Sequence, residues 1–269
     1  MGIPFVDSDH RVLLRLFNHL ETAVGDREDS SVVGSILDSL TEYTKYHFAR
    51  EEHLMELCGY PQLDAHRETH RRLTGEVGDF MAALAADPGG FDSRRFVDFV
   101  RGWLISHILQ DDFAYRDICR DKTEAIAQAG ACRLTDGMGS GLDWRRLKVL
   151  LVEDNPNFRR LIETLLTVAG THEARSVMSA QEGLDSLMKY PADVVLCDVV
   201  MDGMDGVAMA REVFRIDPLT RFVFVSGLDG EVLRRRASAV GVDAVLEKPL
   251  SATGLFGAIA KAMDGAVRQ

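Results

Sequence analysis

The stretch Val149-Leu150-Leu151-Val152-Glu153-Asp154-Asn155 marks the point in this chain of 269 residues where one hydrophobic pattern gives way to another. Its apolar run is too short for a helix, and two acids follow at once. Such a run is typical of a buried strand in a parallel sheet. Up to about residue 120 the apolar pattern is helical, and after residue 146 short strand-like runs alternate with helical ones. The sequence therefore predicts two domains of different fold class.

The C-terminal part repeats this strand signal several times. A weaker strand is expected near 172–176, and apolar runs recur at 194–197, 222–225 and 244–246. Helical stretches fall at about 157–168, 180–189, 205–215, 231–239 and 251–263. Strands that alternate with helices form βαβ units with a parallel sheet. We therefore predict for residues 147–269 an α/β, flavodoxin-like, doubly wound parallel sheet of about five strands.

The N-terminal part carries apolar residues three and four apart over the ranges 9–24, 31–57, 63–86 and 93–119. This spacing puts the apolar residues on one face of each helix. Turn residues separate the stretches, at Gly25-Asp26, Gly59-Tyr60-Pro61 and Pro88-Gly89-Gly90. Residues 1–121 are therefore predicted to form an all-α, antiparallel four-helix bundle. The glycine-rich segment 122–146 is expected to be a linker, although 124–131 could continue a helix.

Composition limits the possible functions. The chain is 46% hydrophobic and 27% charged, which excludes wholesale disorder. The net charge is -11 and neither half is basic, which argues against nucleic-acid binding through bulk charge. No apolar run approaches the ~20 residues of a membrane span, and the start lacks a signal peptide. The four cysteines form no C-x-x-C pair, so we expect buried, reduced thiols in a cytoplasmic protein without membrane association.

Histidines are concentrated in the predicted bundle. Each of its four helices offers at least one that can point inward: His10, which opens the first helix, then His47, His66, His70 and His107. His66 and His70 are four residues apart, as are His47 and Glu51, and such pairs share a helix face. One such pair is more often a solvated face. Convergence from four helices favours instead a dinuclear site for iron, zinc or copper.

The N-terminal part resembles the bacterial hemerythrin family. The matching segments are Asp9-His10, residues 47–52, residues 66–70 and residues 103–112, within about residues 3–120. The resemblance implies a non-haem di-iron centre with an oxo or hydroxo group and an open position for dioxygen. It assigns His66, His70 and His107 to one iron and His10 and His47 to the other. Glu51 and Asp112 would bridge the two irons.

Two details of this assignment remain open from the residues alone. Asp111 is four residues after His107 and is better placed on an ideal helix, whereas Asp112 lies roughly 140° off that face. The resemblance nevertheless selects Asp112. Trp103 and Leu104, one turn before His107, are expected to wall an apolar dioxygen pocket, with ordinary core packing as the alternative.

Polar residues follow several predicted strands of the second domain: Glu153, Asp154, Asp198, Ser226 and Lys248. The carboxyl ends of parallel strands meet at one edge of the sheet, where ligands bind. Clustered carboxylates suit Mg²⁺, while a lysine and a hydroxyl suit a phosphoryl group. Taken singly, the acids could cap helices and the lysine could be a surface residue. Their coincidence at four strand ends favours a site.

Residues 147–265 resemble the receiver domain of two-component response regulators. The resemblance makes Asp198 the phosphoacceptor, with Ser226 and Lys248 as phosphoryl ligands and a cis peptide at Lys248-Pro249. It implies a Mg²⁺ site formed by these groups: Glu153, Asp154, Asp198 and the main-chain carbonyl of Val200. The sequence departs from the family at Asp202, where proline is usual. It also departs at Val245, where an aromatic switch residue is common.

Together the two resemblances imply a non-enzymatic signalling protein. The bundle would sense dioxygen or redox state through two iron ions, and the receiver would take phosphate from a histidine kinase or phosphotransfer protein. A ligand set with only two carboxylates favours dioxygen binding or redox cycling over substrate oxidation. The alternatives are an oxygen or iron carrier regulated by phosphorylation, and a di-iron enzyme acting on peroxide or nitric oxide. A homodimer is a possible assembly, and no nucleic-acid partner is expected.

Overall fold

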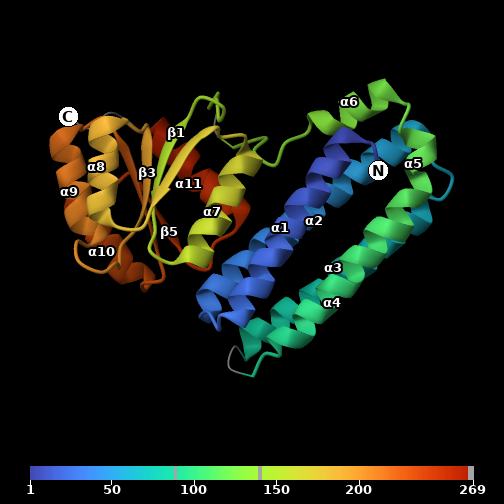
Figure 1. Cartoon of the computed structure of the whole chain (residues 1–269), viewed down its shortest axis with the longest axis horizontal. Coiled ribbons are helices and arrows are strands. Elements are labelled where there is room, and N and C mark those ends of the chain that lie inside the picture. The colour runs from blue at the N-terminus through green and yellow to red at the C-terminus, as the bar shows by residue number, and fades with distance from the viewer. Residues whose placement is uncertain (88–89, 139–140, 266–269) are drawn as a thin grey trace. The chain divides into compact units, whose positions relative to one another are not determined.

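The computed structural model describes the chain except residues 88–89, 139–140 and 266–269. Its residues divide into two compact units, Met1–Leu134 and Thr135–Gln269 (Figure 1). Part of the predicted turn at Pro88-Gly89 and part of the glycine-rich segment, Gly139-Ser140, lie outside the described residues. Among the described helices, none combines the length and the apolar character that a bilayer crossing requires.

The first unit is helical. Its elements in chain order are α1 (Pro4–Gly25), α2 (Ser30–Cys58), α3 (Leu63–Ala86), α4 (Ser93–Ser106), the π-helix η1 (His107–Asp112), α5 (Phe113–Cys119) and α6 (Thr123–Ala131). The Asp29 side chain caps α2, and Gly59 ends it in the left-handed conformation at φ 69°. Pro4 starts α1 well before the predicted residue 9. His10 therefore lies in the second turn of α1. The expectation that His10 opens the first helix is wrong.

The fourth predicted helix is interrupted. A continuous helix was expected over 93–119, but the structure changes to π geometry between His107 and Asp112. A π-helix pairs residues five apart, so it brings Asp112 onto the face that His107 occupies. Asp112 is consequently buried, whereas Asp111 is only half-buried.

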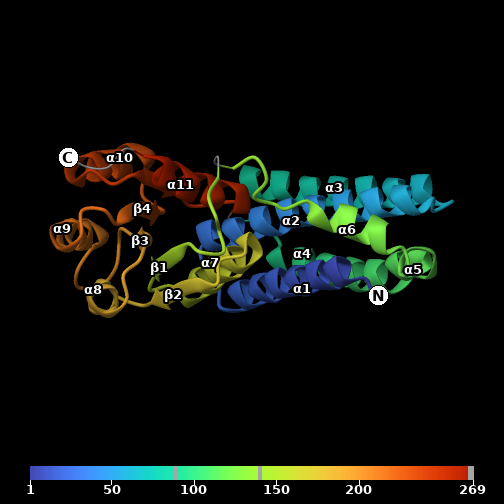
Figure 2. The same ribbon diagram turned by 90° about the horizontal axis from the view of Figure 1, so that it is seen from above.

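The segment expected as a linker begins with a helix. Helix α6 runs alongside α2, as Figure 2 shows, and hydrogen bonds attach it there. The Arg50 guanidinium donates to the carbonyls of Ala129 and Gly130, and the Tyr46 hydroxyl donates to that of Cys132. The helical alternative for 124–131 is thus the structure observed, and α6 belongs to the first unit.

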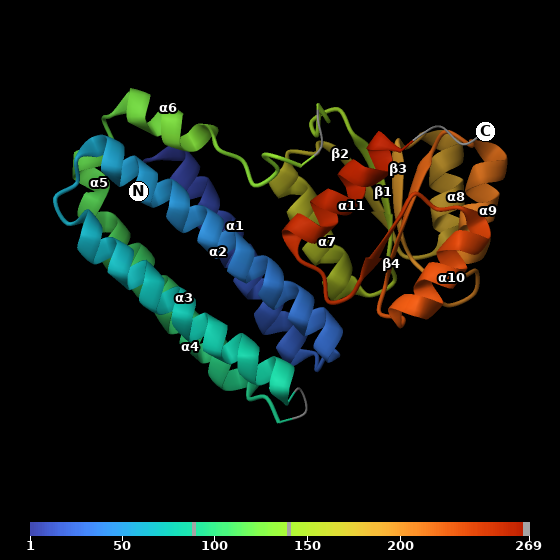
Figure 3. The same ribbon diagram turned by 180° about the vertical axis from the view of Figure 1, so that it is seen from behind.

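The second unit is a parallel sheet of five strands in the order β2-β1-β3-β4-β5. The strands are β1 (Lys148–Val152), β2 (Glu173–Val177), β3 (Val194–Asp198), β4 (Arg221–Ser226) and β5 (Ala244–Glu247). The helices are α7 (Pro156–Ala169), α8 (Ala180–Lys189), α9 (Gly206–Ile216), α10 (Gly230–Val240) and α11 (Ala252–Asp264). Helices α7 and α11 cover one face of the sheet, and α8, α9 and α10 cover the other (Figure 3). The central strands are buried on both faces, which explains their continuous apolar runs.

The close approach of α9 to β3 depends on a glycine. Gly206 begins α9 directly against β3, where a Cβ would lie 2.4 Å from the Asp198 carbonyl oxygen, so a side chain there would displace the strand end.

The expectation that all four cysteines are buried is wrong for two of them. Cys132 follows the end of α6 and is exposed, and Cys58 at the end of α2 is only half-buried.

Candidate metal and phosphoacceptor sites

The seven predicted iron ligands lie together inside the bundle, and each is at most 7% exposed. They form two overlapping groups, Glu51-His66-His70-His107 and His10-His47-Glu51-Asp112. The ligand atoms of each group lie within 4.8 Å of one another. The structure therefore brings together every residue that the sequence analysis named for this cluster.

The Asp112 carboxylate lies between the two groups. One oxygen, Oδ2, is 3.0 Å from Nε2 of His10, while the other, Oδ1, is 3.1 Å from Nε2 of His107. Each oxygen thus faces a different set of histidines. This is the arrangement that a carboxylate bridging two cations requires.

Glu51 also contacts both groups. Its Oε2 lies 3.4 Å from Nε2 of His47 and 3.7 Å from Nε2 of His70. The two histidines belong to different groups, so Glu51 is shared as Asp112 is. Helical spacing accounts for the first contact, because His47 and Glu51 are four residues apart on α2.

Several polar atoms of the cluster lie close to one another and yet form no hydrogen bond. Among the residues that the structure describes, these buried atoms accept or donate no hydrogen bond: Nε2 of His10, both nitrogens of His47, Oε2 of Glu51, Nε2 of His66 and both oxygens of Asp112. Such atoms are costly unless something pairs with them. Imidazole nitrogens and carboxylate oxygens suit iron, so the residues present fit a pair of metal ions.

Burial and charge set the protonation of the cluster. Burial lowers the pKa of His10 and His66, and it lowers that of His70 to about 2. These rings are therefore neutral, the form that binds metal. Burial also acts on His107, but its contacts with Glu51 and Asp112 outweigh it and raise the pKa to about 9.

Carboxylates orient two of the histidines, His70 and His107, through hydrogen bonds from their far side. Oε1 of Glu52 lies 2.7 Å from Nδ1 of His70, and Oδ2 of Asp111 lies 3.1 Å from Nδ1 of His107. Asp9 lies behind His47 in the same way, with Oδ2 3.5 Å from Nδ1, but without a hydrogen bond. Such partners fix which ring nitrogen faces a metal. Asp111 therefore has a position of its own, outside the cluster and behind His107.

Sequence analysis gave no role to several residues that support this cluster. Asp9 accepts two hydrogen bonds from Arg50, at 2.8 and 2.7 Å, and one from the Tyr43 hydroxyl at 2.9 Å. The Tyr115 hydroxyl donates to Oε1 of Glu51, and burial raises the pKa of this phenol. The adjacency of Asp9 to His10 was the available signal, whereas nothing in the local sequence marks Tyr115.

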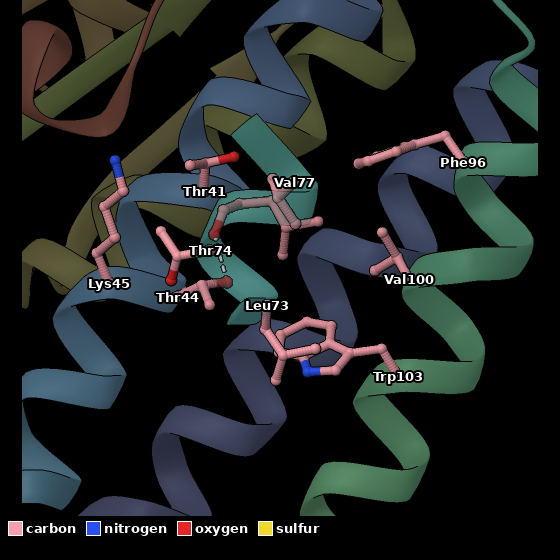
Figure 4. Close-up of a pocket in the computed structure, with 10 residues that line it drawn as sticks. Thr41, Thr44, Lys45, Leu73, Thr74, Val77, Phe96, Val100 and Trp103 are labelled. Atoms are coloured by element: carbon pink, nitrogen blue, oxygen red, sulfur yellow. Dashed lines mark hydrogen bonds between the residues drawn. The ribbon is translucent and has the colours of Figure 1, made fainter. Parts of the chain in front are cut away.

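An apolar pocket lies between α2, α3 and α4 (Figure 4). Trp103 forms part of its wall, together with Leu73, Val100 and others, and the indole ring stacks at 6.0 Å from the ring of His107. Leu104 is buried but is not among the residues that line this pocket. Of the two predicted pocket residues, Trp103 alone is placed there.

The second unit has a charged cluster at the carboxyl ends of its strands. Lys248 reaches both buried acids, with Nζ 3.0 Å from Oε2 of Glu153 and 2.9 Å from Oδ2 of Asp198. Nζ also lies 3.9 Å from the centre of the Phe158 ring. Burial raises the pKa of Glu153 to about 7, even though Lys248 opposes the shift. The acids also raise the pKa of Lys248 against the effect of its burial.

The other predicted residues of this cluster surround Asp198. Asp154 is exposed and joins Glu153 and Asp198 in a group whose ligand atoms lie within 4.8 Å of one another. The Val200 amide donates to Oδ1 of Asp198 at 3.0 Å. Ser226 ends β4, one residue after Val225, which is the register partner of Asp198. Its hydroxyl is buried and accepts a hydrogen bond from the Leu228 amide.

Two expectations from the receiver resemblance concern β5 and the turn after it. The Lys248-Pro249 peptide is cis, as that resemblance implied. Val245, which stands where an aromatic residue is common, is half-buried and packs against the hydrophobic core of the second unit. The fold and the two clusters together define a two-unit protein, with a candidate cation site in a helical bundle and an acid–lysine site on a parallel sheet.

Comparison with known proteins gives the families. Residues 1–118 match the hemerythrin HHE cation binding domain, and residues 149–260 match the response regulator receiver domain. Bacteriohemerythrin of Stenotrophomonas maltophilia (strain R551-3) is 35% identical over 117 residues, which cover 44% of this chain and 74% of that protein. The response regulator receiver protein CpdR of Brucella abortus (strain 2308) is 31% identical over 119 residues, 44% of this chain and 98% of that protein.

A crystal structure of a response regulator receiver domain protein from Clostridium thermocellum is 28% identical and covers 44% of this chain and 94% of that chain, with a TM-score of 0.41. From the matches of the two sequence segments, the chain belongs to the hemerythrin family through its N-terminal unit. It belongs to the response regulator receiver family through its C-terminal unit.

Proposed function

We propose that this fused protein is a signalling protein that couples a di-iron sensor to a phosphorylation site. The bundle would bind two iron ions and respond to dioxygen or redox state. The receiver would accept a phosphoryl group on Asp198 from the phosphohistidine of a histidine kinase or phosphotransfer protein. The observation that carries the proposal is the set of buried, unsatisfied ligand atoms in the bundle, in a chain that also holds a complete acid–lysine cluster.

The two groups of ligands support a specific assignment. His66, His70 and His107 would hold one iron, while His10 and His47 would hold the other. Glu51 and Asp112 would bridge, because each contacts histidines of both groups. The set with two histidines has fewer protein ligands, which leaves room for an exogenous ligand there.

When bound, the iron pair would supply dioxygen binding and electron exchange. The chain's own residues would control access and orientation. Glu52 and Asp111 hold the far nitrogens of His70 and His107, and thereby keep Nε2 directed inward. Trp103, stacked beside His107, would keep one approach to the site apolar and exclude water.

In the receiver, a carboxylate oxygen of Asp198 would attack the phosphorus of a phosphohistidine. The new P–O bond forms as the P–N bond breaks, and the imidazole leaves. Lys248 now pairs with Oδ2 of Asp198 and would pair with the phosphoryl oxygens after the transfer. The Ser226 hydroxyl would donate a hydrogen bond to the same oxygens. The groups that would hold Mg²⁺ here are Glu153, Asp154, Asp198 and the Val200 carbonyl.

The test joins metal content to phosphotransfer. Purified, iron-replete full chain should hold close to two irons and show an absorption spectrum that differs between air and reductant. His66→Ala should lower the iron content, whereas His53→Ala, on the exposed side of α2, should leave it unchanged. Phosphorylation rates with one kinase are then compared in the diferrous, oxygenated and diferric protein. Equal rates in all three states would contradict coupling, and turnover of peroxide with intact ligands would favour an enzyme.

A further inference from the structure

One outer face of the bundle carries apolar residues in a regular row. Ile105 is 50% exposed, Leu109 is 61% exposed and Phe113 is 40% exposed. They follow one another at intervals of four residues along α4, η1 and α5. Large exposed apolar residues that stand singly need no explanation, but a contiguous row on one helix face indicates a contact surface.

The π segment keeps this row straight. On a regular α-helix, residues four apart drift by about 40° at each step, so such a row would wind around the helix. The extra residue that a π-turn accommodates cancels part of the drift. The same feature that brings Asp112 inward therefore leaves Leu109 in line with Ile105 and Phe113 on the outside.

Charged residues extend the row at both ends in the same order. Asp98 and Arg101 precede it and pair at 3.0 Å. Asp117 and Arg120 follow it and pair at 3.3 Å. From one end to the other, the row thus carries an acid, a base, the apolar residues, an acid and a base. We call these seven residues the α4–α5 stripe.

We propose that the α4–α5 stripe is the contact surface of a symmetric homodimer, in which a second copy packs antiparallel across Leu109. In that arrangement Leu109 meets its own copy, and Ile105 meets Phe113. Arg101 and Asp117 are equally distant from Leu109, as are Asp98 and Arg120. Every charge on the stripe therefore faces an opposite charge. Each contact occurs twice, as a two-fold axis requires, except the contact of Leu109 with its own copy on the axis.

Charge order selects this arrangement over the parallel one. Two parallel copies in register would place each acid against the same acid and each base against the same base. The chain carries a net charge of -11, so association needs a surface whose own charges balance. A single helix face is smaller than a standard interface, and we expect micromolar affinity.

The first experiment measures the monomer–dimer equilibrium of the iron-replete full chain by sedimentation. Wild type should dimerise reversibly. Leu109→Arg would place two guanidinium groups against each other at the two-fold axis, and should raise the dissociation constant by on the order of a hundredfold. Leu14→Arg is the matched control, because Leu14 on α1 is also exposed, at 41%, and lies off the stripe. It should leave the equilibrium unchanged.

The second experiment tests the antiparallel register. Arg101 also pairs with Glu21 on α1, whereas the further partner of Arg120 is its chain neighbour Asp121, so changing the outer pair breaks no ion pair between helices. Asp98→Arg and Arg120→Glu should each weaken the dimer by roughly fivefold, since each puts like charges opposite one another twice. The double variant restores opposite charges across the interface and should recover most of the lost affinity. Circular dichroism and iron content establish that each variant is folded.

The outcomes that overturn the proposal are distinct. A chain that stays monomeric at high concentration has no such interface. A dimer that Leu109→Arg leaves intact uses another surface, and a double variant weaker than both single ones excludes the antiparallel register. A monomeric chain in which Leu109→Arg alters phosphotransfer would assign the stripe to a different partner.

Discussion

The bundle and the receiver both gather buried carboxylates, but they balance the negative charge in different ways. In the receiver, the Lys248 ammonium lies within 3.0 Å of an oxygen of Glu153 and of one of Asp198. In the bundle, no lysine or arginine of the described residues pairs with Glu51 or Asp112, and histidines surround both. The chain thus supplies a lysine as the compensating cation at one site, and only histidines at the other, where Glu51 and Asp112 raise the pKa of His107.

This difference implies different dependence on metal. A receiver with its own cation has a satisfied site before any ion binds, so Mg²⁺ would bind reversibly during signalling. The bundle leaves ligand atoms unsatisfied, so metal binding there should add directly to the free energy of folding. Arg50, a buried arginine near the histidines, is paired with Asp9 and with carbonyls of α6 instead.

The largest effect that we expect comes from removing the proposed phosphoacceptor. Asp198→Asn should abolish phosphorylation, because the amide cannot act as the attacking oxygen, while iron content should stay at the wild-type level. Phosphate incorporation from labelled phosphohistidine and metal analysis on the same sample measure both. Loss of iron in this variant would show that the two sites are not independent and would break the comparison above.

Removing iron should cost the bundle far more than removing Mg²⁺ costs the receiver. The two tryptophans provide separate probes, since Trp103 lies in the bundle and Trp144 packs on Phe256 in the receiver. In Trp144→Phe protein, Trp103 reports the urea unfolding of the bundle. Chelation of iron should lower the free energy of unfolding measured in this way by several kcal/mol. In Trp103→Phe protein, the Trp144 transition should hardly move when EDTA removes Mg²⁺.

Helical periodicity explains why the inner ligands could be predicted from sequence. His66 and His70 are four apart on α3, and four-residue spacing alone puts both on one face. In the receiver, the alternation of strands and helices similarly predicted a parallel sheet, which placed Asp198 and Lys248 at one edge. These are local regularities, and each needs only a few neighbouring residues.

The features that sequence reasoning missed depend on contacts between distant residues. Tyr115 reaches Glu51 across 64 positions, and Arg50 reaches Asp9 across 41. The π segment is a further case, because nothing in His107–Asp112 itself excludes a regular helix. The π segment forms because burying Asp112 in the cluster outweighs the loss of regular α-helical hydrogen bonds. Tertiary packing decides between these two contributions to the free energy.

The receiver's internal cation can be tested by deletion. Lys248→Met leaves Glu153 and Asp198 buried without their partner, and should lower the free energy of unfolding of the receiver by about 2–4 kcal/mol. Urea unfolding followed by Trp144 in Trp103→Phe protein measures this. Lys148→Met, at the exposed start of β1, is the control and should have little effect. Millimolar Mg²⁺ should restore part of the loss in Lys248→Met, because it offers those carboxylates another cation. Unchanged stability without Mg²⁺ would mean that the lysine does not balance the acids.

The smallest expected effect separates the two neighbouring aspartates of η1. Asp112 has both oxygens inside the cluster, whereas Asp111 contacts only the far nitrogen of His107. Asp111→Asn keeps a hydrogen-bond acceptor at that position but removes its charge, so iron affinity should fall by about tenfold. Asp112→Asn removes a ligand shared by both groups, so the iron affinity of this variant should fall much further than that of Asp111→Asn. Competition with a calibrated iron chelator measures the two affinities. Equal losses in the two variants would indicate that the π segment does not distinguish an inner carboxylate from an outer one.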